Sequence, residues 1–148
     1  ILMGTITTAM CNSFKQELLG GVHDLDTHTL KLALIKPSPT GSFGAATTNY
    51  SELTSSSDEA SGTNYSAGGQ NLDSATISLS GTTAFVDFAD EVFSNLTITA
   101  AGALIYNSSA SNKAIAVFSF GSNVASTAGD FTVIFPAADA SNAVLRIT

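Results

Sequence analysis

The sequence predicts an all-β domain, a β-sandwich or jelly-roll-like fold with one short helix near its N-terminus. Three observations lead to this expectation. Seven short segments alternate apolar and polar residues with a period of two, which is typical of strands with one buried face. Clusters of Gly, Pro, Ser, Thr and Asn separate these segments. Only one segment combines helical periodicity with a start and a stop signal.

The predicted helix spans Ser13–Leu19. Ser13 is expected to cap it, and Gln16, three residues further on, completes a capping box. Gly20 and Gly21 then end the helix, because glycine adopts the left-handed conformation found after helix C-termini.

The residues before this helix are expected to form an N-terminal arm, residues 1–11, ahead of one β-rich domain, residues 12–148. Ile1–Met10 has no charged side chain and lacks the basic start and apolar centre of a signal peptide. An uncharged segment of this length is too short to fold alone. We therefore expect it to lie along a neighbouring subunit, where it could add a strand to an exposed sheet edge.

The first predicted strand is Thr29–Lys36, which ends at Pro37 because proline cannot donate to a strand ladder. The Ser-, Thr- and Gly-rich segment Thr40–Asn71 is expected to run over the surface, with brief strand pieces around Tyr50 and Tyr65.

Six strands are predicted in the second half of the chain: Ala75–Ser80, Ala84–Phe88, Leu96–Tyr106, Ala114–Phe120, Phe131–Phe135 and Ala143–Ile147. The expected breaks between them are Ser80–Gly81, Asp90–Glu91, Asn107–Asn112, Gly121–Asp130 and Pro136–Asn142. Gly102, inside a predicted strand, is expected to mark a bulge or a bend between sheets.

The charge content narrows the possible partners. Only 11% of the residues are charged, against about a quarter in an average soluble domain, and the formal net charge is −7. The five bases are scattered, which argues against nucleic acid as a partner. No apolar run approaches the roughly 20 residues that a membrane helix needs. A β-protein with so few charges is expected to keep much of its surface against other subunits.

The candidates for chemistry all have a simpler structural interpretation. Cys11 could be a reactive thiol, although a small apolar residue near a helix start is the simpler interpretation. His23, Asp24, Asp26 and His28 have metal-ligand side chains, and the last three could converge on one side of an extended segment. The alternative is a polar connection between the helix and the first strand.

The densest acids of the strand-rich half are Asp87, Asp90 and Glu91. Paired carboxylates can perform acid–base or glycosidase chemistry. The simpler interpretation places Asp87 on the solvated face of a strand, pointing away from its neighbours, and makes Asp90–Glu91 the turn that follows. The glycosylation sequons at Asn49, Asn64, Asn95 and Asn107 are expected by chance in a chain so rich in Ser and Thr.

Several segments together resemble a family of small virion structural proteins of tailed bacteriophages, described as capsid decoration or cement proteins. The resembling segments are Asn12–Leu19, Gly21–His23, Gly62–Gly69, Val86–Asp90, Gly102–Ser109 and Phe131–Ile147. The resemblance covers Cys11 to Ile147, and its C-terminal block is the most specific part. The family pattern has an arginine near position 101, where this chain has alanine.

The resemblance implies a capsid decoration protein that clamps neighbouring major capsid subunits, with the major capsid protein and copies of itself as partners. Such a protein would form a homo-oligomer within the virion, would lie on the capsid surface and would pass through the host cytoplasm during assembly. The alternative is a phage tail or fibre component, and a carbohydrate-binding module or small hydrolase is a weaker third possibility. We expect no enzyme activity, no cofactor, and no catalytic, cofactor-binding or metal-binding residues.

Overall fold

Two antiparallel β-sheets form the fold, so the all-β class expected from the sequence is confirmed. The computed structural model describes residues 3–148. Its elements are β1 (Ala9–Met10), α1 (Asn12–Leu19), β2 (Leu30–Ile35), α2 (Ser51–Ser55), β3 (Gln70–Asn71), β4 (Thr76–Ser80), β5 (Thr83–Asp87), β6 (Glu91–Asn107), the 3-10 turn η1 (Ser108–Ala110), β7 (Lys113–Val133) and β8 (Leu145–Ile147). No helix within residues 3–148 is long and apolar enough to cross a membrane.

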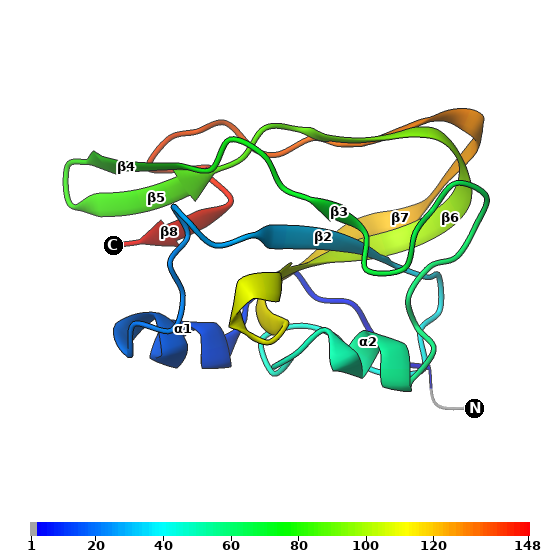
Figure 1. Ribbon diagram of the computed structural model, residues 1–148, viewed down its shortest axis with the longest axis horizontal. Helices are drawn as coiled ribbons and strands as arrows, with labels where there is room; N and C mark the ends of the chain where they lie inside the picture. Colours follow the sequence, from blue (N-terminus) through cyan, green and yellow to red (C-terminus); the bar gives the residue numbers. More distant parts are fainter. Residues whose placement is uncertain (1–2) are drawn as a thin grey trace.

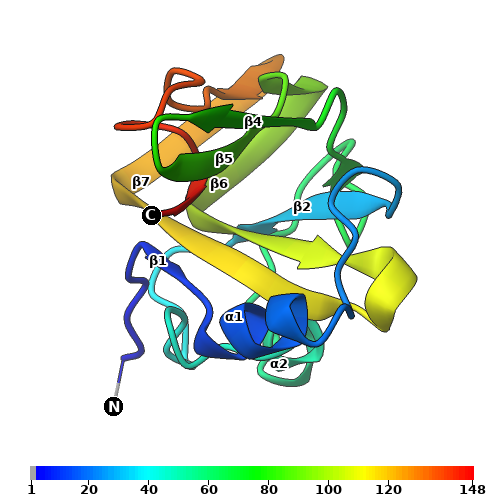
Figure 2. The ribbon, with the colours of Figure 1, turned by 90° about the vertical axis from the view of Figure 1, so that its left-hand side faces the viewer.

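The larger sheet has the strand order β1-β7-β6-β2-β3, and the smaller sheet has the order β4-β5-β8. Figures 1 and 2 show α1 and α2 on one side of the larger sheet and the smaller sheet on the other side. Strands β6 and β7 form a long hairpin, joined through η1, whose far end rises beyond the larger sheet toward the layer of the smaller one (Figure 1).

The core is centred on the three middle strands of the larger sheet. Four consecutive residues are buried in β2 (Leu32–Ile35), and β6 (Ala103–Tyr106) and β7 (Ala114–Val117) contain similar runs. Successive strand residues point to opposite faces, so an unbroken buried run means that both faces are covered. Side chains below the sheet, such as Phe14 of α1 and Leu53 of α2, belong to the same core cluster.

Strands β6 and β7 are longer than the sequence predicts. The break expected at Gly121–Asp130 is wrong, because β7 continues through it. The break expected at Asp90–Glu91 is present between β5 and β6, but it ends at Asp90 because β6 begins at Glu91. The residues expected to form turns lie where the pairing of β6 with β7 shifts in register. Gly121 and Ala128 lie in β7 at these places, with positive φ angles of 76° and 46°. These are bulges, which bend a strand without ending its pairing. The bulge expected at Gly102 is confirmed by a register shift between Ala100 and Gly102.

The N-terminal segment pairs with its own chain. Thr7 donates a backbone hydrogen bond to the Phe43 carbonyl (2.9 Å), and β1 adds to the edge of β7 with Ala9 opposite Val117. The expectation that this arm lies along a neighbouring subunit is therefore wrong for residues 3–10, since its backbone groups find partners within the chain. Ile1 and Leu2 lie outside the described residues.

Two local predictions also differ. Cys11 rather than Ser13 occupies the N-cap of α1, and its side chain makes no capping hydrogen bond. The strand piece expected around Tyr50 is reduced to one bridge, between Asn49 and Lys113, and the one-turn helix α2 follows it. Asn49 Oδ1 accepts from the Ser51 N–H (2.9 Å) at the start of this helix.

Gly69 holds the surface segment against β2. It has a φ of +73°, and a Cβ atom there would overlap the Leu32 carbonyl oxygen, so only glycine allows this close approach.

Candidate functional site

An apolar groove with a volume of about 300 Å³ lies between α1 and the smaller sheet. We define the groove by six of its lining side chains, Phe14, Leu18, Ile77, Val86, Leu145 and Ile147. A second apolar hollow of about 290 Å³ adjoins it, since Leu18 and Ile147 line both.

Strand register explains why these side chains meet. Ile77, Val86 and Leu145 are cross-strand partners in β4, β5 and β8, so they project from the same face of the smaller sheet. Because strand residues alternate between faces, Leu79 and Ile147 project from that face as well. This face lies above α1 at the left of Figure 1.

Large apolar side chains around the groove are open to solvent. The exposed fraction is 92% for Leu19, 73% for Leu79, 54% for Ile147 and 53% for Ile77. A group of large apolar side chains exposed near one another is a feature of interaction surfaces. The groove and these rim residues therefore form the candidate functional site.

The two polar residues that line the groove, His23 and Asp24, are both engaged within the chain. Asp24 accepts hydrogen bonds from the Asp26 N–H (3.1 Å), from the Thr27 N–H (3.2 Å) and from the Thr27 hydroxyl (2.7 Å). The hydroxyl, then the Asp26 N–H, holds the pKa of Asp24 below its ordinary value. Asp24 is a turn-capping residue, as in the polar-connection interpretation of this segment.

The two histidines considered as metal ligands, His23 and His28, meet at Asn107, whose side chain is fully buried. Asn107 Oδ1 accepts from the Ala110 N–H (3.1 Å), so its amide nitrogen faces the rings. That nitrogen lies 3.1 Å from His23 Nδ1 and 2.9 Å from His28 Nδ1. An amide nitrogen only donates, so both Nδ1 atoms accept and each neutral ring carries its proton on Nε2.

The proton on His23 Nε2 is directed at Glu17 of α1. His23 Nε2 lies 2.9 Å from one carboxylate oxygen of Glu17, and Lys113 Nζ lies 2.8 Å from the other. Burial alone would raise the pKa of Glu17, but Lys113 and His23 outweigh it and lower the pKa. The network joins α1 to β7, and within residues 3–148 no group of three or more His, Cys, Asp or Glu side chains is placed to hold a metal ion.

The three acids singled out in the strand-rich half, Asp87, Asp90 and Glu91, have different environments. Asp90 Oδ1 accepts from the Phe135 N–H (2.9 Å). Asp87 is half-buried, and its Oδ1 has no hydrogen-bond partner. The interpretation of Glu91 as part of a solvated turn is wrong, because Glu91 is 8% exposed and begins β6. Burial, followed by the charge of Asp73, raises the pKa of Glu91.

Cys11 is fully buried at the start of α1, and its thiol lies 3.8 Å from the Gly44 carbonyl. Burial, followed by the charges of Glu52 and Glu17, raises the pKa of the thiol to about 12. A nucleophilic cysteine needs a lowered pKa and an adjacent base, so this environment is that of an inert thiol. The sequon residue Asn107 is also inaccessible, with no exposed surface.

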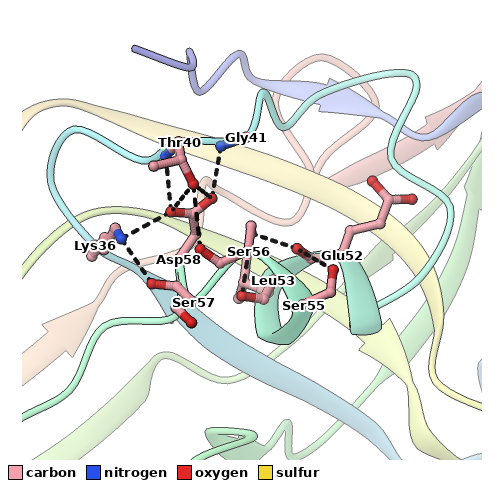
Figure 3. A network of polar contacts seen from close by, with 9 residues as sticks. All are labelled: Lys36, Thr40, Gly41, Glu52, Leu53, Ser55, Ser56, Ser57 and Asp58. Atoms are coloured by element: carbon pink, nitrogen blue, oxygen red, sulfur yellow. Dashed lines mark hydrogen bonds and ion pairs between the residues drawn. The ribbon is translucent and has the colours of Figure 1, made fainter. Parts of the chain in front are cut away.

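A buried carboxylate that the sequence analysis did not single out holds the surface segment in place. The side chain of Asp58 has no exposed surface, and it accepts hydrogen bonds from the backbone N–H groups of Thr40 and Gly41, each 2.8 Å long. Lys36 Nζ lies 3.0 Å from the same carboxylate and 2.7 Å from the Ser57 carbonyl. Figure 3 shows these groups converging on Asp58, beside the end of α2.

A second unpredicted cluster gathers all three tyrosines of the chain around Glu59. The Tyr50 hydroxyl donates to one carboxylate oxygen of Glu59 (2.5 Å), and the Tyr65 hydroxyl donates to the other (2.8 Å). The Tyr106 hydroxyl donates to the Gly68 carbonyl (2.7 Å), and the Gly68 N–H donates to the Glu59 carboxylate (2.6 Å). The sequence does not predict that these side chains meet, because they come from four separate segments of the chain.

Comparisons with known proteins add no relative: no family model, no curated protein and no solved structure matches this chain. The assignment of a function therefore depends on the chemistry of the surface and on the resemblance described above.

Proposed function

We propose that the protein is a virion structural protein of a tailed bacteriophage, a decoration protein that clamps neighbouring subunits of the capsid shell. The observation that carries this proposal is the exposed apolar rim of the groove, led by Leu19 and Leu79. Exposed aliphatic side chains have no role in solubility, whereas they contribute to association when a partner covers them.

The chemistry of the groove favours binding over catalysis. Its walls are aliphatic and aromatic, and its two polar residues, His23 and Asp24, already have partners within the chain. A catalytic pocket needs polar groups that converge on a reacting atom. The groove offers instead a complementary seat for apolar side chains of another protein.

Sugar binding is disfavoured by the placement of the aromatic side chains. None of the nine Phe and three Tyr side chains, all of which lie within the described residues, is classed as exposed. A carbohydrate module presents exposed aromatic faces to its ligand, whereas every ring here is buried or half-buried.

A clamp of this kind works through repetition. One buried aliphatic side chain contributes about 1.5–3 kcal/mol, which is modest for a single contact. A shell offers many equivalent sites, so a modest interface repeated over the shell strengthens the particle as a whole. The low charge of the chain, 11%, suits a protein whose surface is largely covered in the assembly.

The test is co-expression with the major capsid protein encoded in the same genome, followed by sedimentation of assembled shells. We expect the protein to sediment with shells, and Leu19→Asp and Ile147→Asp to weaken this binding about tenfold or more each, because each places a charge in the interface. Ile134→Asp is the matched control, since Ile134 is 75% exposed and lies outside the groove.

Two outcomes would overturn the capsid assignment. One is sedimentation with tail tubes or fibres and not with shells, which would indicate the tail component. The other is equal loss of binding with Ile134→Asp, which would mean that the groove is not the contact.

A further inference from the structure

The outer strand of the smaller sheet, β4, has an open edge. It pairs with β5 on one side over five consecutive residue pairs without a register shift. The sheet order β4-β5-β8 leaves its other side unpaired, at the margin of the sheet in Figures 1 and 2. Within residues 3–148, no backbone hydrogen bond reaches Ile77 or Leu79 from outside this sheet.

The hairpin geometry determines which backbone groups face the open edge. Gly81 and Thr82 form a two-residue turn, so the flanking pair Ser80 and Thr83 exchanges hydrogen bonds across the hairpin. Backbone groups alternate along a strand. The N–H and C=O groups of Ile77 and Leu79 therefore point away from β5.

This edge lacks the protection that natural edge strands carry. Charged side chains, proline and bulges prevent strand addition, and the β4 sequence Thr-Ile-Ser-Leu-Ser contains none of them. The other sheet edges are shorter or interrupted. The terminal strands of the larger sheet, β1 and β3, have two residues each, and β7 beyond β1 is interrupted by register shifts and by residues with positive φ such as Gly121. The three-residue β8 carries the charge of Arg146.

We propose that β4 pairs antiparallel with β4 of a second copy of this chain, about a two-fold axis through Ser78. In this register Ile77 lies opposite Leu79 of the partner subunit, and Leu79 lies opposite the partner's Ile77. Their outward N–H and C=O groups form four backbone hydrogen bonds. The two three-stranded sheets become one six-stranded sheet in the order β8-β5-β4-β4-β5-β8.

The side chains fit a second copy of the same strand. The four apolar side chains meet in cross-strand pairs on the face that carries the groove, and on the other face Thr76 lies opposite Ser80 of the partner subunit. Both kinds of pair stabilise antiparallel sheets. The two-fold axis is perpendicular to the sheet, so both copies of the groove lie on the same side of the joined sheet.

Charge is the second argument for self-pairing. The chain carries a net charge of −7, so two copies associate only where acids stay apart. The acid nearest to β4 within the hairpin is Asp87, opposite Thr76. From strand spacings, the two copies of Asp87 would lie roughly 20 Å apart, beyond the Debye length of about 10 Å.

This inference does not depend on the virion assignment, because the edge is a property of the isolated chain. A dimer in solution that fails to bind shells would overturn the proposed function and leave the pairing intact. A monomer that binds shells would overturn the pairing and leave the function intact.

The first test is disulfide trapping in the purified full chain. Ser78→Cys places two thiols opposite each other at the axis, in a non-hydrogen-bonded pair whose Cα spacing suits a disulfide. Ser80→Cys, on the same strand and face, is the matched control, because it lies opposite Thr76 of the partner subunit. Cys11 is buried and does not interfere.

We expect Ser78→Cys to form covalent dimers under mild oxidation roughly tenfold faster than Ser80→Cys, because only the first variant brings its thiols together. Equal rates in folded protein, as judged by circular dichroism, would overturn the proposed register.

The second test exchanges the apolar pair for charges. The double variant Ile77→Lys/Leu79→Lys places lysine opposite lysine across the axis, whereas Ile77→Glu/Leu79→Lys places glutamate opposite lysine. We expect sedimentation equilibrium to show self-association roughly tenfold weaker for the first double variant than for the second. Equal association would overturn the pairing. Loss of shell binding by the lysine variant without any dimer of the wild type would also overturn it, in favour of a strand donated by another protein.

Discussion

Replacing Asp58 tests whether one buried carboxylate holds the surface segment onto the fold. Its side chain has no exposed surface, and it gathers two backbone N–H groups, from Thr40 and Gly41, with the ammonium group of Lys36. Asp58→Asn keeps the shape and removes the charge. The single oxygen of the amide can still accept a hydrogen bond. Its NH₂ group only donates, so one of the donors that Asp58 binds loses its acceptor.

The magnitude follows from these contacts. A hydrogen bond to a charged group contributes about 1.5–3 kcal/mol, and an N–H left buried without a partner costs about 1–3 kcal/mol. The ion pair adds less than about 1 kcal/mol, because the Lys36 side chain is 33% exposed and solvent screens it. We expect Asp58→Asn to lower the free energy of unfolding by about 3 kcal/mol, a large share of the 5–15 kcal/mol typical of a domain.

The same contacts make part of the stability depend on pH. Burial alone would raise the pKa of Asp58, but the backbone hydrogen bonds from Thr40 and Gly41 and the hydrogen bond from Lys36 outweigh it and hold the pKa well below its ordinary range. The folded pKa is thus lower than the unfolded value near 4, so this contribution is fully present above about pH 4. It is lost as the pH falls through the folded pKa.

Urea unfolding followed by circular dichroism measures both effects. The difference in unfolding free energy between wild type and Asp58→Asn is expected to be largest at neutral pH and to shrink below about pH 4. Asp26→Asn is the control, since Asp26 is exposed and its side chain makes no hydrogen bond within residues 3–148. A difference below about 0.5 kcal/mol at neutral pH, the level of an ordinary surface substitution, would refute the reasoning.

Three further predictions concern other buried groups. Asn107→Ala leaves His23 Nδ1 and the Ala110 N–H without a partner and leaves His28 Nδ1 only the Asp24 N–H, so urea unfolding should show a loss of about 2–3 kcal/mol, and a loss below about 0.5 kcal/mol would contradict the network. Cys11 should react with a thiol reagent at about pH 8 only after unfolding, and equal rates in native and unfolded protein would count against its burial. Burial, followed by the charge of Glu59, raises the pKa of Tyr106 to about 12, so its contribution to stability is present below the ordinary tyrosine pKa and is lost as the pH rises toward 12. Ultraviolet titration should therefore show no phenolate from Tyr106 near pH 10 in folded protein, and a full phenolate signal from all three tyrosines there would contradict the site.

The sequence predicted the strands whose faces alternate and missed features that depend on partners. β2, β4 and β5 lie within one residue of the predicted bounds, because each has a period-two pattern and a turn signal at its end. The break expected at Gly121–Asp130 failed, since glycine and small polar residues mark both turns and bulges. Only the pairing partner distinguishes the two, and here β6 continues alongside.

The helix α2 could have been found from the sequence. Asn49 followed three residues later by Glu52 is a capping signature, although the surrounding Ser and Thr residues suggested only a loop. The Asp58 and Glu59 clusters could not have been found, because each joins segments whose proximity is set by the fold. The groove also depends on the placement of α1 beneath the smaller sheet, which strand patterns do not encode.

The few charges of this chain are distributed unevenly between its two sheets. Lys36 and Lys113, two of its five bases, pair with acids that hold loops and α1 onto the larger sheet. Such pairs fix geometry more than they add solubility. The smaller sheet bears apolar side chains on one face and an uncharged edge at β4, with Arg146 on its opposite edge strand. Substitutions in the larger sheet should therefore change stability, while charges added at β4 should change association and leave the unfolding free energy nearly unaltered. This separation makes self-pairing at β4 measurable without unfolding the domain.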